Sequence, residues 1–422
     1  MTVTVTTLDN GLRVASHTMP HLGTVSLGVW VGVGARDETI AQHGICHLLE
    51  HMAFKGTRRR SARQIAEEIE MVGGDLNAAT SLEMTAYYVR VLEPDVELAL
   101  EILADILQNS RFDAKELRLE KEVVLQEIAG IQDIPDELAY DLVQATAFPD
   151  QGVGRPVIGT PESVRALSTD SLFGHLRERY VAPRMVVAAA GAIEHEALVR
   201  HARALFGGLS STSAAHGDAA RFVGGAGGLD REFEQAHVIV GFDSPAYVDE
   251  DFFRAQVFAG LLGGGMSSRL FQKAREERGL CYSIYASAWG LRDGGLFSVH
   301  AATGAELVDE LAGLVAAELE DCAAGGIGEG ELARAKAQIK AGLLMSLESS
   351  GARAEQMARQ LLGLDRIIDI HELIARVEAE SVDSLREFAD RLLGARKAAV
   401  AVVGAGARST ELAHGVHSRM TA

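Results

Sequence analysis

The chain has 422 residues, of which 47% are hydrophobic and 23% are charged, a composition typical of globular proteins with large apolar cores. Its formal net charge of −19 argues against nucleic acid as a main partner, because binding to phosphates requires clustered Lys and Arg. No apolar run reaches the roughly 20 residues that a membrane span needs, and the N-terminus lacks the pattern of a signal peptide.

The predicted elements of the first half are strands and helices without a regular alternation. In chain order they are a strand ending at the turn Asn10-Gly11, a strand over 24–33, a helix over 43–54, a helix capped by Ser61 and ending at Gly73-Gly74, a strand over 85–91, a helix from Pro94 to about Leu107, and a helix capped by Asp113 and running to about Ile128. This mixture predicts an α+β fold with a largely antiparallel sheet and helices packed on one side.

A weak internal duplication indicates two similar halves. The tripeptide Asp-Ser-Leu occurs at 170–172 and again at 383–385. An apolar strand follows at 185–191 and again at 398–404, with the same offset of 213 residues. Between the halves lies a stretch rich in Gly and Ser, which is typical of a linker. We therefore predict an N-terminal domain over 1–209, a linker over 210–229 and a related C-terminal domain over 230–422.

Cysteine usage favours a reducing compartment. Cys46, Cys281 and Cys322 are too few and too scattered for a disulfide framework, so we expect them to be free and buried. The expected location is the cytoplasm.

The stretch His47-Leu-Leu-Glu50-His51 predicts a metal site. Its two histidines are four residues apart on an expected helix, so they lie about 40° apart on one face and one turn apart along the axis. This spacing allows both imidazoles to reach one zinc ion. Glu50 projects beside the same ion, where its carboxylate can take a proton from a bound water.

A catalytic zinc needs a third protein ligand, for which the residues alone leave two candidates. Glu120 and Glu127 are seven apart, hence on one face of the helix expected over 113–128. One carboxylate could bind the zinc while the other holds a ligand or the water network from outside. His43, four residues before His47, offers a rival ligand pair, although Gly44 disfavours helix at that point.

The motifs together resemble the pitrilysin and mitochondrial processing peptidase family of zinc metallopeptidases, the inverzincins. The resemblance is strongest to bacterial processing-peptidase-like members and to the β subunit of the mitochondrial enzyme. It covers nearly the whole chain and depends on the stretches that begin at Leu8, Gly34, His47, Gly73, Glu120, Gly154 and Gly263. It implies two similar halves that enclose a chamber, with the N-terminal one holding the zinc.

The resemblance also implies roles for particular residues of the first half. The family's third zinc ligand lies 76 positions after the second histidine, which corresponds to Glu127, and Glu120 then matches an additional catalytic carboxylate that does not bind the metal. Asn77 and Ala78 match a stretch that binds the substrate backbone on an edge strand. Such a strand can add an extended peptide by main-chain hydrogen bonds.

In the second half, Arg275 and Tyr282 match an Arg and Tyr pair that binds substrate and takes part in catalysis in the family. A guanidinium or phenol near the scissile carbonyl would stabilise a developing oxyanion. This half has no second His-x-x-Glu-His motif, so the resemblance implies one zinc ion per chain.

The expected activity is zinc-dependent endopeptidase cleavage of extended or unfolded peptides, with basic or presequence-like peptides favoured by the acidic balance of the chain. The resemblance implies a homodimer, or a heterodimer with an inactive homologue. The alternatives are an inactive scaffold or partner subunit of the same fold, and a peptide-binding module with structural zinc, which would normally have four protein ligands.

Overall fold

The computed structural model describes residues 3–212 and 217–422, and the chain divides into two compact units. The first unit contains Met1–Ile128, Pro156–Asp218 and Met345–Ile368. The second contains Ala129–Arg155, Ala219–Leu344 and Asp369–Ala422. Relative to the domain boundaries predicted from sequence, each unit thus includes one segment from the other half of the chain.

The first unit contains an open six-stranded sheet in the order β1-β2-β6-β3-β5-β4. Neighbouring strands are antiparallel except β2 and β6, which are parallel. The strands are β1 (Val3–Thr7), β2 (Arg13–Thr18), β3 (Thr24–Val31), β4 (Asp75–Thr80), β5 (Thr85–Leu92) and β6 (Met185–Gly191). The predicted strands over 24–33 and 85–91 therefore form, and β4 is left at one edge of the sheet.

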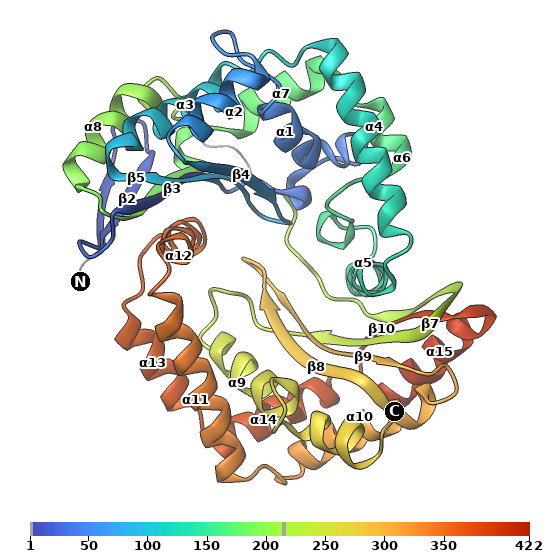
Figure 1. The fold of residues 1–422 in the computed structure, drawn as a ribbon. Coiled ribbons are helices and arrows are strands. Elements are labelled where there is room, and N and C mark those ends of the chain that lie inside the picture. Colours follow the sequence, from blue (N-terminus) through green and yellow to red (C-terminus); the bar gives the residue numbers. More distant parts are fainter. Residues whose placement is uncertain (1–2, 213–216) are drawn as a thin grey trace. The chain divides into compact units, whose positions relative to one another are not determined.

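Helices cover the two faces of this sheet unequally. The larger core includes residues of the helices α1, α2, α3, α7 and α8, whereas α12 packs on the other face against β2, β3 and β6 (Figure 1). The helices of this unit are α1 (Ile45–Ala53), α2 (Ala62–Met71), α3 (Val96–Gln108), α6 (Pro161–Ala166), α7 (Thr169–Arg179), α8 (His195–Phe206) and α12 (Ser350–Leu364), with 3-10 turns η1 (Ala35–Asp37), η2 (Ile40–Gln42), η3 (Glu93–Asp95) and η5 (Ala182–Arg184). Because side chains alternate along a strand, β3 and β6 contribute to both cores.

The sheet of the second unit is open and follows the same plan, in the order β10-β7-β9-β8. Its long strand β7 (Gly225–Asp243) has two arms that both pair with β10 (Ala399–Ala405). The first arm, residues 225–229, runs parallel to β10. Along the second arm, residues 237–241, the residue numbers of β7 fall as those of β10 rise, so this arm is antiparallel to β10. The second arm pairs antiparallel with β9 (Gly295–Thr303), and β9 pairs antiparallel with β8 (Cys281–Gly290). The arms correspond to β2 and β3, and β10 corresponds to β6, so the repeated apolar strand has the same position in both sheets.

The second unit also takes one helix from the other half of the chain. Helix α5 packs against β7 and β10, the position that α12 occupies in the first unit. The helices of this unit are α5 (Pro135–Ala147), α9 (Phe252–Gly263), α10 (Val308–Ala323), α11 (Glu329–Ser346, with its last two residues in the first unit), α13 (Ile370–Ala379), α14 (Val382–Gly394) and α15 (Ser409–Met420), with 3-10 turns η4 (Gly152–Gly154) and η7 (Gly406–Arg408) and the π-helix η6 (Phe271–Glu277). Helix α4 (Ala114–Ile131) begins in the first unit, and its last three residues belong to the second.

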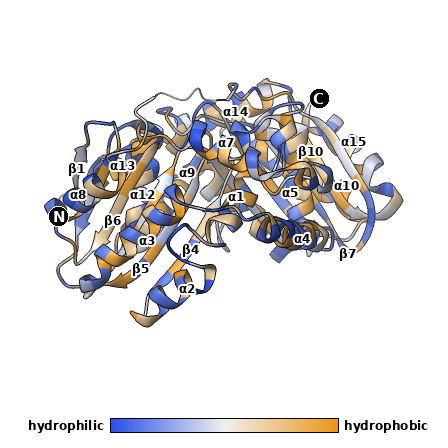
Figure 2. Ribbon diagram, turned by 90° about the horizontal axis from the view of Figure 1, so that it is seen from above, coloured by the Kyte–Doolittle hydropathy of each residue, from blue (hydrophilic) through white to orange (hydrophobic). Residues whose placement is uncertain are grey.

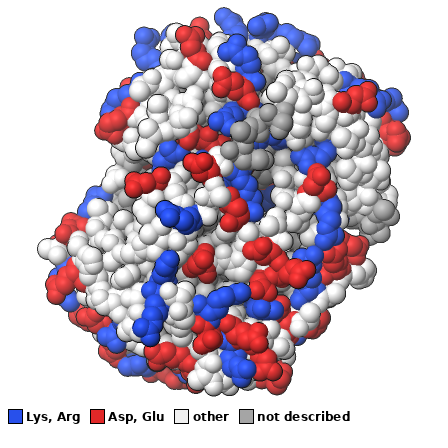
Figure 3. Space-filling model, turned by 180° about the vertical axis from the view of Figure 1, so that it is seen from behind, with Lys and Arg blue, Asp and Glu red and all other residues white. Residues whose placement is uncertain are grey.

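All three cysteines are buried and free, as predicted from their number and spacing. Among the described residues, no helix is both long and apolar enough to cross a membrane. Lys and Arg are interspersed with Asp and Glu on the face shown in Figure 3. In Figure 2 the hydrophilic colouring is strong along α4, the helix that carries both candidate glutamates.

Candidate metal centre

Helix α1 starts two residues later than predicted because the chain must pass close to a neighbouring loop. Gly44 has a positive φ of 86°, and a Cβ there would lie 2.8 Å from the carbonyl oxygen of Ile158. The buried carboxylate of Glu38 accepts hydrogen bonds from the backbone N–H groups of Gly44 and Cys46, both at 2.8 Å. A negative charge at a helix N-terminus is favourable, so Glu38 fixes where α1 begins.

The histidine pair lies on the accessible side of α1. Ile45, Leu48 and Met52 are fully buried on the opposite side and attach the helix to the core. The imidazole centroids of His47 and His51 are 4.8 Å apart. Burial, and then the nearby His51, lower the pKa of His47 to about 4, so its ring is neutral near pH 7, the form that binds metals.

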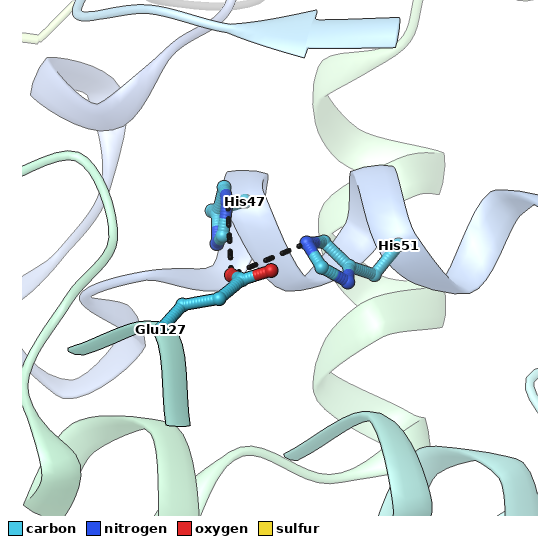
Figure 4. A group of neighbouring side chains, drawn as sticks. All are labelled: His47, His51 and Glu127. Atoms are coloured by element: carbon cyan, nitrogen blue, oxygen red, sulfur yellow. Dashed lines mark ion pairs between the residues drawn. The ribbon is translucent and has the colours of Figure 1, made fainter. Parts of the chain in front are cut away.

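Glu127 of α4 approaches both rings. Its Oε2 lies 3.6 Å from Nε2 of His51 and 3.9 Å from Nε2 of His47 (Figure 4). The three side chains offer ligand atoms that all lie within 4.8 Å of one another. Ligands of a tetrahedral zinc at about 2.0–2.2 Å are of this order apart, so two imidazoles and one carboxylate can hold one ion and leave a position open.

Glu120 is not a member of this group but contacts one of its members, His51. Its Oε2 is 3.1 Å from Nδ1 of His51, and its Oε1 is 2.6 Å from Nζ of Lys55. A hydrogen bond donated by Nδ1 of His51 to the carboxylate leaves Nε2 with a free lone pair directed toward Glu127. Spacing alone did not decide between Glu120 and Glu127 as the third ligand. In the structure Glu127 faces both imidazoles, and Glu120 orients one of them.

Glu50 lies between the two histidines in sequence and is held by strand β4. Oγ1 of Thr80 donates a hydrogen bond to its Oε2 at 2.5 Å. Burial raises the pKa of the Glu50 carboxyl above its ordinary value, and the bond from Thr80 opposes this shift. A carboxylate that is fixed in position and made more basic by partial burial suits proton transfer.

His43 does not join the group. It lies before α1, where its Nε2 is 2.7 Å from the carbonyl oxygen of Pro156. Cys46 is fully buried, with its Sγ 3.5 Å from Nε2 of His175. Burial raises the pKa of the Cys46 thiol well above its ordinary value, which keeps it protonated and unsuited to binding metal.

Asn77 and Ala78 lie in the edge strand β4, and Thr80 is the last residue of that strand. The N–H of Ala78 donates to Oδ1 of the adjacent Asn77 side chain at 2.8 Å. A side-chain oxygen therefore occupies the place that a carbonyl of an added strand would take at this N–H.

Arg275 and Tyr282 belong to the second unit. The guanidinium of Arg275 lies 4.6 Å from the ring centroid of Phe271 and 5.5 Å from that of Tyr282. The register of β8 and β9 shifts between Cys281 and Ser283, so Tyr282 is the extra residue of a bulge, and it is 72% exposed. A bulge redirects a side chain, which explains the high exposure of Tyr282 within a strand.

Sequence reasoning gave no role to Thr80, Lys55 or Glu38. Thr80 and Lys55 lie within the family-like stretches that begin at Gly73 and His47, which was the available signal. Glu38 ends the family-like stretch that begins at Gly34, but that pattern does not mark it as the N-terminal partner of α1, because its carboxylate reaches the helix from a separate turn.

Two family models match the chain. One, described as insulinase (peptidase family M16), matches residues 13–161, and the other, described as peptidase M16 inactive domain, matches residues 166–339. A relative from Streptomyces coelicolor, named an uncharacterized zinc protease, is 39% identical over 412 residues, which are 96% of this chain and 90% of the relative.

Solved structures share the fold. A protease from Helicobacter pylori superposes with a TM-score of 0.86 at 22% identity, covering 95% of this chain and 99% of the other. A chain of complex III2 from Candida albicans, determined with Inz-5 bound, gives a TM-score of 0.86 at 21% identity and covers 99% of both chains. At these identities the two structures support the architecture of two similar halves.

Proposed function

Because the chain belongs to the M16 peptidase family and is similar to relatives named zinc proteases, we propose that it is a zinc-dependent endopeptidase acting on extended peptides. The observation that carries this proposal is the group of His47, His51 and Glu127, with the Glu50 carboxylate held beside it by Thr80. The family model over the second half is described as inactive, which agrees with a single site per chain, in the first unit.

The donor set fits zinc. Two imidazole nitrogens and one carboxylate oxygen, with the fourth position left to water or substrate, are typical of catalytic zinc sites in peptidases. Nδ1 of His47 is buried and has no hydrogen-bond partner among the described residues. The nitrogen of His47 that approaches Glu127 is Nε2, as it is for His51, so the metal would be held by these two Nε2 atoms and the Glu127 carboxylate.

When bound, zinc lowers the pKa of a water toward about 7 and polarises the scissile carbonyl. With Oε2 engaged by Thr80, the other carboxylate oxygen of Glu50 would accept a proton from the attacking water and would return it to the leaving amine. The Thr80 hydroxyl holds the Glu50 side chain in one rotamer. Glu120 keeps the ring of His51 in the required tautomer, and its ion pair with Lys55 fixes the Glu120 carboxylate in place.

An extended substrate is proposed to add to the free edge of β4. Its carbonyl would replace Oδ1 of Asn77 at the N–H of Ala78, which frees the Asn77 amide to bind the peptide main chain. Arg275 and Tyr282 are proposed to bind the substrate and to stabilise the oxyanion. The net charge of −19 favours basic or presequence-like peptides.

Removal and return of the metal test this function. Incubation with a chelator is expected to abolish cleavage of an unstructured fluorogenic peptide, and about one zinc ion per chain should restore it, as measured by metal analysis and peptide fluorescence. An inactive scaffold would cleave nothing in either state. A structural zinc would be retained without turnover. Undiminished cleavage by metal-free protein would exclude the proposal.

We also propose that the protein acts as a homodimer in the cytoplasm, where the three free cysteines would remain reduced. Light scattering coupled to size-exclusion chromatography is expected to give about twice the 45.0 kDa mass of the chain. A purified protein of single-chain mass with full cleavage activity would contradict the dimer and would make a heterodimeric partner unnecessary.

A further inference from the structure

A cavity of about 360 Å³ lies in the first unit, on the face of the sheet that α12 partly covers. Apolar side chains line it, among them Trp30, Met84, Ala86 and Ala354, which are all less than 10% exposed. Its rim carries two acidic and two basic residues, Asp75, Glu355, Arg90 and Arg359. The formal charge of the rim is therefore zero, and a charged ligand gains no net attraction there.

Small residues keep this cavity open. Helix α12 starts at β3, where the hydroxyls of Ser350 and Ser26 form a buried hydrogen bond of 2.9 Å. The next residue, Gly351, lines the cavity without a side chain. A Cβ at Gly351 would meet only ordinary contacts at 3.8 Å or more. No backbone strain or crowding therefore requires glycine at this position.

The matching positions of the second unit carry aromatic side chains that contact one another. Aligning the strand registers of the two sheets places Ser26 opposite His237, Tyr88 opposite His300 and Asn77 opposite Tyr285. There, Tyr140 of α5 donates a hydrogen bond to Tyr285 at 2.9 Å, and the ring centroids of Tyr285 and His300 are 4.8 Å apart. The duplicated fold thus carries a cavity in one unit and packed aromatic rings at the matching positions of the other.

The cavity reaches the candidate metal centre through β4. Thr80 lines the cavity and also donates to Glu50, and Ala79 lines it from the exposed side of the strand. On an added strand, side chains opposite Asp75, Asn77 or Ala79 point to this same face. A strand advances about 3.3 Å per residue, so a side chain entering the cavity lies within about one to three residues of the scissile bond.

We propose that this cavity is a subsite that binds one uncharged hydrophobic side chain of the peptide, such as Phe, Leu or Met. The inference rests on the proposed function, because it assumes a peptide on the edge of β4. Burial of such a side chain against Trp30 and Met84 supplies affinity, and the neutral rim disfavours Asp, Glu, Lys and Arg at that position. The subsite selects which bond of an extended peptide is cleaved.

A binding experiment with the zinc-loaded Glu50→Gln variant tests the subsite without relying on cleavage. Labelled unstructured peptides that carry a single Phe at successive positions are compared with the all-Ala parent by fluorescence anisotropy. The Phe peptide in the correct register is expected to bind about tenfold or more tightly, because its apolar side chain leaves water on binding; tenfold corresponds to about 1.4 kcal/mol. Replacement of that Phe by Asp should return the affinity to that of the parent or below.

Filling the cavity should remove this preference. Gly351→Leu, added to Glu50→Gln, is expected to bring the Phe and Ala peptides to within about twofold of each other, because the new side chain occupies the space. The matched control is Gly174→Leu in α7, where a Cβ would meet nothing within 4 Å and which does not line the cavity. It should keep the full preference, and the affinity for the Ala peptide should be the same in both variants.

The outcomes separate the two proposals. A Phe preference that survives Gly351→Leu, or the lack of any preference in the parent variant, overturns the subsite even if the wild-type enzyme cleaves peptides. A preference that Gly351→Leu abolishes, in a protein whose wild type binds but never cleaves, supports the subsite and rejects the peptidase. If Gly351→Leu fails to fold, as judged by circular dichroism, Ala79→Leu on the exposed side of β4 replaces it as the filling variant.

Discussion

Replacing Glu50 with glutamine is expected to leave the zinc content of the protein unchanged and to lower kcat for peptide cleavage by about 10²–10⁴-fold or more. Glutamine has the same shape and can still accept the hydrogen bond from Thr80, so the local structure should persist. It cannot take a proton, however, which removes the base that the proposed mechanism requires. Metal analysis and initial rates on one fluorogenic peptide measure both quantities.

The control for this variant is Glu122→Gln, which makes the same change on the exposed side of α4 and should have wild-type zinc content and rate. Loss of zinc from Glu50→Gln would mean that Glu50 is a ligand. Full activity of a zinc-loaded Glu50→Gln protein would place the base elsewhere.

Replacing Glu127 with glutamine is expected to lower zinc affinity more than any other single change on α4. Its Oε2 is the one carboxylate oxygen within 4 Å of both imidazoles among the described ion pairs. Glu120→Gln should weaken binding by about 10–100-fold, the usual effect of losing a partner that orients a ligand, and Glu127→Gln should exceed that range. Competition with a chromophoric chelator measures the affinities.

Thermal unfolding gives an independent readout of the same series. A ligand that binds only the folded state raises Tm with concentration, so zinc should raise Tm of the wild type, less so for Glu120→Gln and least for Glu127→Gln. The Glu127 side chain is 41% exposed, so the metal-free proteins should have nearly equal Tm. Equal zinc affinity for Glu127→Gln and Glu122→Gln would show that the third ligand is not on this helix.

Sequence patterns predicted the features that arise within single elements. Ser61 caps α2 as expected, with its hydroxyl accepting from the N–H of Gln64. The strands β3 and β5 and the helices α3 and α4 lie where periodicity and caps placed them, and the two halves are similar, as the repeated words indicated. Such features follow from backbone geometry and apolar spacing, which depend on residues that are close together in the sequence.

Exchange of the helices α5 and α12 between the two units was not predictable in this way. Both helices are amphipathic. Apolar residues with a period of 3.6 predict that one face of a helix is buried, but they do not predict which sheet that face packs against. The structure decides this through the contacts of α5 with β7 and β10 and of α12 with β3 and β6. The exchange also shapes both units locally, because Gly351 and Ala354 of α12 line the cavity and Tyr140 of α5 contacts Tyr285 at the matching position of the second unit.

By itself, the sequence determined that His47 and His51 share one face of a helix, because residues four apart must do so at about 100° per residue. It also placed Glu120 and Glu127 on one face of α4, for the same reason. Only the tertiary structure decided that Glu127 faces both imidazoles, that Glu120 lies between His51 and Lys55, and that Thr80 holds Glu50. These contacts join residues 30 to 80 positions apart, and their distances depend on how α1, α4 and β4 pack, which no local spacing specifies.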